Sequence, residues 1–439
     1  MKKSNSILGD QRILFLLAAL MAVSMWFYVD RILVGYQVED AAAHQRPRGN
    51  LSDLYPRWLG ARELLLHHRN PYSDDIAIEI QKGYYGRALD SNRPNDPKDQ
   101  QKFVYPVYVV FLLAPLIKFP FHSVQVFFHW LILALTTASV WLWLRALHWR
   151  ISIWSMASVI ALTLGCFPSV QGIKIQQPSM LVAVFMAGAA ACAAGGLLAL
   201  SGILLALATI KPQLAWPMVA WLLFWALSDW GARRKLVFAF TLAMAFLLIG
   251  AEFILPGWWG MFADGMRQYH QYAQNQSVLD VLFPWGFAGK ILGAIATLAC
   301  AAALMGLRKA PGNELRFGRA TALVMALTVL VVPMYAPYNQ VLLLPALLVL
   351  ARDRILLFSR SQGVRFAYLA GVFALSWQWV AALSLSAGYM FGFKAWALRG
   401  WWWPGLATFA LPVLVLALML VDVQFKVGES SRLPRKRTA

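Results

Sequence analysis

The chain has 439 residues, of which 60% are hydrophobic and only 13% are charged. A soluble domain carries about a quarter charged residues, so this composition excludes an ordinary soluble enzyme and a disordered protein, and three cysteines exclude a disulfide scaffold. The net charge is +19. In so apolar a chain this excess indicates the cytoplasmic charge bias of a membrane protein rather than nucleic-acid binding.

The N-terminal region predicts an uncleaved first transmembrane helix over 13–29, because the run is long and no small-residue cleavage site follows it. Apolar runs at the following positions predict eleven more spans: 123–146, 151–168, 179–196, 198–210, 213–228, 235–256, 286–307, 320–336, 339–351, 365–386 and 401–422. Two of these runs, 198–210 and 339–351, are short, and we expect either half-helices there or helices that continue into polar cavity-lining residues. Three prolines interrupt 104–119, which we expect to be re-entrant or to lie on the surface. The expected fold is therefore an all-α polytopic membrane protein with about twelve transmembrane helices, forming a single domain over 1–439.

The basic residues predict the orientation of these helices. With both termini in the cytoplasm, 21 lysines and arginines fall in cytoplasmic segments, including the basic tail 423–439, and six fall in short outside loops. The first extracytoplasmic loop, 36–103, is large and polar, and 257–285 is a second sizeable one. Cysteines without metal or disulfide spacing, and the lack of an organelle-targeting tail, favour a bacterial inner membrane.

Asp53 is the leading candidate for chemistry in the first outside loop. The stretch from Asp53 to His68 has apolar residues at helical spacing, which predicts an amphipathic helix at the membrane surface. An alternative role for Ser52 or Asp53 is the helix N-cap. The adjacent pair His67-His68 does not have the spacing of a metal site, so we expect no metal and no cofactor.

A second group of polar residues lies beside the predicted spans on the same outside face. Lys211 interrupts an apolar stretch, and a lysine in such a place needs an anionic partner such as a phosphate, unless it snorkels at a short turn. Lys174, Arg267 and His270 are further candidate cations, and Gln177 supplies an amide suited to sugar hydroxyls. Their convergence on one face favours an outward-facing active site over a transport path, which would place polar residues at mid-membrane in two repeats.

With these features the chain resembles the GT-C fold glycosyltransferases, and in detail glycosyltransferase family 87, the polyprenyl-phosphate-mannose-dependent mannosyltransferase type. The matching pieces occur in family order: Asp53-Leu54-Tyr55, Asn70-Pro71-Tyr72, Phe103-Val104-Tyr105-Pro106, Gln176-Gln177-Pro178-Ser179, Lys211-Pro212, Asn275-Gln276-Ser277, and Pro337 followed by Pro345.

The resemblance implies that a sugar, mannose or another hexose or pentose, passes from a polyprenyl-phosphate donor to a lipid or glycan acceptor on the extracytoplasmic face. Asp53 would be the general base, and Lys211, Lys174, Arg267 and His270 would bind the donor phosphate. The expected substrate-binding residues are Arg57, Tyr105, Gln177, Asn275, Gln276, Tyr338 and Asn339. Membrane lipids are expected partners and nucleic acid is not.

Two other functions compete with this interpretation. A transporter or flippase of lipid-linked sugars would also fit twelve spans, but the large first loop disfavours it. A polymerase or ligase of surface polysaccharide is disfavoured because the later outside loops are shorter than the first.

Overall fold

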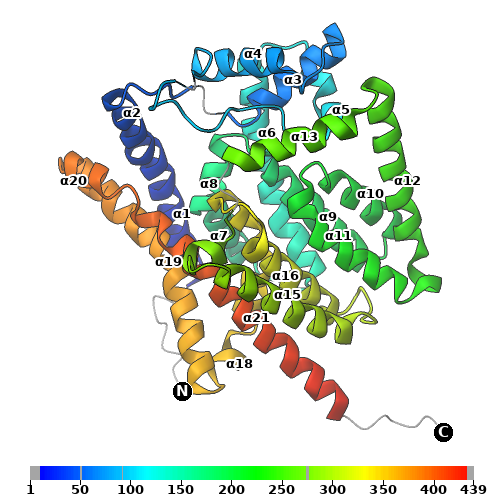
Figure 1. Ribbon diagram of the computed structural model, residues 1–439. Helices are drawn as coiled ribbons and strands as arrows, with labels where there is room; N and C mark the ends of the chain where they lie inside the picture. Colours follow the sequence, from blue (N-terminus) through cyan, green and yellow to red (C-terminus); the bar gives the residue numbers. More distant parts are fainter. Residues whose placement is uncertain (1–9, 50–51, 91, 273–275, 433–439) are drawn as a thin grey trace.

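The computed structural model describes residues 10–49, 52–90, 92–272 and 276–432, with side chains to 423. Within these residues the chain is helical and contains no strand. Figure 1 shows long helices forming a bundle, with shorter helices laid across one end of it. Several of the helices are apolar enough to cross a bilayer, so the expectation of a multi-pass membrane protein is confirmed.

Six helical segments of the described residues are long and apolar enough to span a membrane. They are Gln11–Ala43 (α1, Gln11–Phe27; η2, Tyr28–Leu33; α2, Val34–Ala43), α6 (Phe121–Ala146), α12 (Trp230–Ile254), α15 (Ala288–Leu307), α19 (Gln362–Met390) and Lys394–Val423 (α20, Lys394–Arg399; η5, Trp403–Gly405; and α21, Ala407–Arg432). A seventh span arises if the bent pair α7 (Ile153–Leu164) and α8 (Phe167–Lys174) is counted as one.

The expected number of twelve spans is not confirmed, because the remaining apolar runs form shorter helices. These are α9 (Pro178–Ala194), α10 (Leu198–Ala208), α11 (Pro212–Leu227), α16 (Leu315–Val331), η4 (Pro337–Leu343), α17 (Leu344–Arg352) and α18 (Arg354–Phe358). A helix needs about 20 residues to cross the hydrocarbon core. Most of α9 and α16 is buried against other helices, so hydropathy here reports burial inside the protein as well as contact with lipid.

The first large polar loop folds onto one end of the bundle (Figure 1). It contains α3 (Tyr55–His67) and α4 (Asp74–Tyr85), and the proline-interrupted segment forms only α5 (Val109–Leu113) and η3 (Ala114–Leu116). The expected amphipathic helix is therefore present as α3, but it buries residues on several sides rather than one stripe. In Figure 1, α13 (Trp258–Tyr272) lies crosswise between this layer and the bundle, and α14 (Val278–Leu282) follows it in the chain.

Buried arginines hold helix ends together at the other end of the bundle. The guanidinium of Arg233 donates to the carbonyls of Trp225, Arg308 and Ala310, at the ends of α11 and α15. Terminal carbonyls of a helix lack intrahelical partners, so one cation satisfies several of them. The last turns of α21 also lie at the end opposite α3 and α4 (Figure 1).

A second buried arginine joins three helical segments by ion pairs. Arg319 of α16 contacts Asp353 beside α17, and its Nε lies 2.9 Å from Oδ2 of Asp422 in α21. Arg319 and Asp422 are 6% and 0% exposed. Charges this deeply buried persist only when they are paired, so this cluster ties α16, α17 and α21 together.

Candidate active site

A polar cavity of about 210 Å³ lies where the first large polar loop meets the bundle. Residues from six separate parts of the chain line this polar cavity: Asp53, Arg57, Asp99, Gln101, Lys102, Val104, Tyr105, Gln177, Lys211, Gln213, Met266, Tyr269, His270, Pro333, Met334 and Tyr338. The cavity brings together the base and the cation that the sequence singled out, although they are far apart in the chain.

Asp53 precedes α3 without capping it. The N-cap position is Leu54, which makes no side-chain capping bond. Instead, the backbone N–H of Asp53 donates to the carbonyl of Ile175 (2.8 Å), and its carboxylate accepts a hydrogen bond from Nε2 of Gln177. Burial raises the pKa of the Asp53 carboxyl, while Arg57 and Lys211 oppose the rise. A carboxylate held this way beside a cavity has the properties of a general base.

Arg57 fixes one wall of the polar cavity. Its Nη1 donates to the carbonyl oxygen of Asp53 (2.6 Å), and its guanidinium lies 4.2 Å from the ring centroid of Tyr105. The hydrogen bond and the cation–π contact orient the guanidinium from two sides. Arg57 and Tyr105, both expected from the sequence, therefore form a rigid pair next to Asp53.

Lys211 is buried at the floor of the polar cavity, with 5% of its surface exposed. Its Nζ donates to Oγ of Ser179 (2.7 Å) and to Oε1 of Gln177 (3.4 Å), and lies 5.2 Å from the ring centroid of Tyr338. Burial, together with the charge of Arg57, lowers the pKa of Lys211 to about 7, although Asp53 acts in the opposite direction. The ammonium is thus poorly solvated, and an anion would stabilise it.

Two helix N-termini point at the same place. Gln177 is the N-cap of α9 and Lys211 is the N-cap of α11, and both helices begin with a proline. Proline is favoured in the first turn because its fixed φ suits the helix and its missing N–H would have no intrahelical partner. The N-terminus of a helix carries a partial positive charge that favours anions. The sequence X-Pro at 177–178 and 211–212 therefore places two such termini beside one lysine.

The other expected residues divide between the polar cavity and its surroundings. Tyr338 and His270 line it. Asn339 lies behind the lining, where its Oδ1 accepts from Oγ of Ser179 (2.9 Å). The backbone carbonyl of Gln276 accepts from the N–H of Tyr335 (2.8 Å), so Gln276 helps to hold the loop that follows α16. Asn275 lies outside the described residues.

Two of the candidate cations are placed elsewhere. Lys174 forms an ion pair with Asp30 of η2, and Arg267 pairs with Asp264 on the same face of α13, where its side chain is 76% exposed. Neither lines the polar cavity. Among the described residues there is no group of three histidine, cysteine or acidic side chains placed to hold a metal ion.

Sequence reasoning missed the segment 99–102, which supplies the mouth of the polar cavity. Asp99 accepts from the backbone N–H (3.0 Å) and from Nε2 (2.9 Å) of Gln101, and Lys102 Nζ donates to Gln268 of α13 (3.0 Å). The sequence contains one indication of this role, because the segment directly precedes the Phe103-Val104-Tyr105-Pro106 motif. Gln213, two residues after Lys211, was missed as well.

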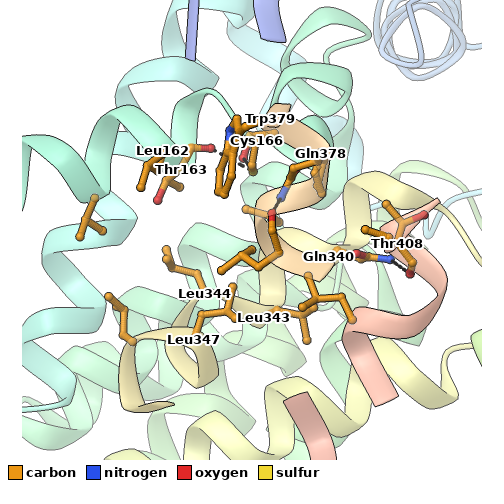
Figure 2. Close-up of a pocket in the computed structure, with 18 of the residues that line it drawn as sticks. Leu162, Thr163, Cys166, Gln340, Leu343, Leu344, Leu347, Gln378, Trp379 and Thr408 are labelled. Carbon is orange, nitrogen blue, oxygen red and sulfur yellow. Dashed lines mark hydrogen bonds between the residues drawn. The ribbon is translucent and has the colours of Figure 1, made fainter. Parts of the chain in front are cut away.

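Two apolar spaces flank the polar cavity. The first, here called the apolar pocket, has about 210 Å³ and lies on the other side of η4. Figure 2 shows Leu343, Leu344 and Leu347 on one side of the apolar pocket and Leu162 and Trp379 on the other. Gln340 donates to the Thr408 carbonyl at its edge. With few polar groups, this pocket is unsuited to sugar chemistry.

The second apolar space, here called the lipid-facing groove, has about 660 Å³ and is lined by α5, α9, α10 and α12. Leu242 and Phe246 of α12, which line it, are 73% and 74% exposed. Its wall includes Ile210, the residue immediately before Lys211. The groove therefore extends from the apolar surface of the bundle to the residue next to the buried lysine.

Comparison with protein families gives one match, to the model of glycosyltransferase family 87, over residues 103–333. The matched region is just over half of the chain and includes Gln177, Lys211 and Tyr269, whereas Asp53 and Arg57 precede it and Tyr338 follows it. No curated protein and no solved structure matches the chain.

Proposed function

The chain belongs to glycosyltransferase family 87 and is a membrane glycosyltransferase, and from this premise we propose that its reaction takes place in the polar cavity. The proposed reaction transfers a sugar, mannose in the first instance, from a polyprenyl-phosphate donor to a hydroxyl group of a lipid or glycan acceptor. Asp53 is the general base, and Lys211 binds the donor phosphate.

The arrangement around Lys211 supports the assignment of the phosphate subsite. The ammonium of Lys211 and the N-termini of α9 and α11, which begin after Gln177 and Lys211, supply positive charge in one place. Burial removes water from around the ammonium and so disfavours its charge. The negative charge of a bound phosphate would compensate for this loss of hydration. As the glycosidic bond to the phosphate breaks, negative charge grows on the leaving oxygen, and fixed positive charge in a water-poor site stabilises it.

The position of Asp53 supports its role on the acceptor side. An acceptor hydroxyl attacks the anomeric carbon, the bond from that carbon to the phosphate oxygen breaks with its electron pair going to the phosphate, and Asp53 takes the hydroxyl proton. Such a base contributes roughly 100- to 10,000-fold in rate. Arg57, Tyr105, Tyr338 and the 99–102 segment surround the remaining space and would contact the sugars.

The lipid-facing groove supports a polyprenyl carrier for the donor. Its walls are aliphatic and aromatic, and Leu242 and Phe246 expose it to the bilayer. A prenyl chain in this groove would bring its phosphate to Lys211, since Ile210 belongs to the groove wall. Burial of each methylene contributes about 0.8 kcal/mol, so a long chain gains much of its affinity here.

The proposed orientation places the polar cavity on the extracytoplasmic face of a bacterial inner membrane, with both termini in the cytoplasm. Its support is the excess of lysine and arginine in the segments assigned to the cytoplasm. In this orientation the layer formed by α3 and α4 faces outside, together with the polar cavity beneath it.

The observation that carries the proposal is the shared cavity of Asp53 and Lys211. The test is transfer by the purified protein, in detergent or vesicles, from polyprenyl-phosphate-mannose to a panel of lipid and glycan acceptors. We expect a new glycosidic product with the native chain and a loss of at least about 100-fold with Asp53→Asn. Movement of substrate across vesicles without a glycosidic product, or full activity of Asp53→Asn, would refute the proposal.

A further inference from the structure

Gln177 uses both ends of its side-chain amide within the protein. Nε2 donates to Oδ2 of Asp53, and Oε1 accepts from Nζ of Lys211 at 3.4 Å. The side chain is 2% exposed. The amide therefore links Asp53, the proposed base for the acceptor hydroxyl, with Lys211, the proposed ligand of the donor phosphate.

Only one orientation of this amide suits both neighbours. If the amide were reversed, its oxygen would face the carboxylate and its NH₂ group would face the ammonium, and both contacts would be repulsive. The charge of Lys211 thus fixes which end of Gln177 meets Asp53. The hydrogen bond in turn fixes the rotation of the carboxylate, because it engages Oδ2 and leaves Oδ1 for the acceptor hydroxyl.

We propose that Gln177 is a positioning residue that orients the Asp53 carboxylate for proton abstraction and is itself oriented by Lys211. This inference rests on the proposed function, and it replaces direct substrate contact as the role of Gln177. An amide that loses the Lys211 contact is held only by its hydrogen bond to Asp53, so the occupancy of the phosphate subsite and the geometry of the base are coupled through one side chain.

The charged groups around Asp53 shift the pKa of its carboxyl, so the pH dependence of the rate can test the role of Gln177. Arg57, on α3, and Lys211, at the start of α11, favour the ionised carboxylate, whereas Asp99 from the cavity mouth disfavours it. The hydroxyl groups of five tyrosines also interact electrostatically with it: Tyr84, Tyr85, Tyr105, Tyr269 and Tyr338. The hydrogen bond from Gln177 lowers the pKa of Asp53, so its removal moves the acid limb of the pH–rate profile to higher pH.

The test compares native enzyme with Gln177→Leu, which keeps the volume but cannot hydrogen-bond. We expect kcat to fall roughly 10- to 100-fold, as for a lost hydrogen bond to a charged group. The KM of the donor and the KM of the acceptor should change little, and the acid limb of the pH–rate profile should move to higher pH. Gln177→Glu, which keeps the shape, covers the case in which the leucine variant does not fold. Its carboxylate adds a like charge beside Asp53, so the acid limb moves in the same direction.

The matched control is Gln378→Leu. Gln378 is 5% exposed and accepts a hydrogen bond from the Phe167 N–H (2.8 Å), beside the apolar pocket. This variant loses a buried amide and some stability, but its acid limb stays in place.

Two results would overturn the inference in an enzyme that transfers sugar. One is a rate loss in the Gln177 variants with an unmoved acid limb, which makes Gln177 merely structural. The other is a raised KM at unchanged kcat, which makes it a substrate ligand. Failure of the proposed function looks different, because the native chain would then form no product or Asp53→Asn would retain full activity.

Discussion

Oγ of Ser179 accepts a 2.7 Å hydrogen bond from Nζ of Lys211 and donates one of 2.9 Å to Oδ1 of Asn339. The hydroxyl belongs to the first turn of α9, while Asn339 belongs to η4. The lysine is thereby fixed between three segments that are distant in sequence. A cation fixed before its ligand arrives loses little conformational entropy on binding.

Replacement of Lys211 by methionine keeps much of the side-chain volume and removes the charge. We expect the donor KM to rise roughly 10- to 100-fold, the value of a charge-assisted hydrogen bond, with a smaller effect on the acceptor KM. Steady-state kinetics with each substrate varied in turn measure this. The control is Lys174→Met, whose partner is Asp30 outside the polar cavity. If Lys174→Met impaired donor binding and Lys211→Met did not, the phosphate subsite would be misplaced.

The pH dependence of donor capture follows from the pKa of about 7 at Lys211. As the pH rises through that value, the empty enzyme loses the ammonium proton, so kcat/KM for the donor should fall about tenfold per pH unit. A bound phosphate favours the charged lysine, so the alkaline limb of kcat should lie at higher pH. Lys211→Arg should abolish the alkaline limb, because arginine stays protonated. An unchanged limb in that variant would assign the ionisation to another group.

If the prenyl chain of the donor lies in the lipid-facing groove, blocking the groove should impair long-chain donors more than short-chain donors. Ala243 of α12 lines this groove, and Ala243→Trp should fill part of it. We expect the KM of a long-chain donor to rise roughly tenfold, equivalent to losing contact with about two methylenes, while a donor with one or two isoprene units is unaffected. Leu298→Trp, at a position that is 70% exposed on α15, provides the control. An equal effect on long and short donors would argue against a prenyl chain in the groove.

The buried ion cluster should govern stability without touching the reaction. Arg319→Met removes the cation between Asp353 and Asp422, and breaking a buried pair in this way costs about 3–5 kcal/mol. Thermal unfolding of the purified protein should show a large decrease in midpoint temperature, while kcat per folded molecule stays unchanged. Arg267→Met, at an exposed ion pair, should change the midpoint little. Equal midpoints for the two variants would contradict this prediction.

The composition and the motif residues determined the class of the protein and indicated the two residues that we propose as central to the site, Asp53 and Lys211. Scarce charge and long apolar runs are sufficient to indicate helices in a membrane, because every backbone polar group in the hydrocarbon must be paired within a helix. Asp53 and Lys211 could be singled out because a charge beside an apolar run is costly and therefore informative. Hydropathy cannot separate a helix that faces lipid from one buried in protein, so the runs 179–196 and 320–336 predict spans although α9 and α16 are mostly buried against other helices.

Only the tertiary structure decided which polar residues meet. Lys174 and Lys211 look alike in sequence, yet one turns toward Asp30 and the other lies in the polar cavity with Gln177. The segment 99–102 carries no hydropathy signal, and it reaches the polar cavity because the loop folds back over the bundle. Local sequence sets the helices and their first turns, whereas the meeting of Asp53, Gln177 and Lys211 depends on contacts between segments that are 124 and 34 residues apart, which no local pattern encodes.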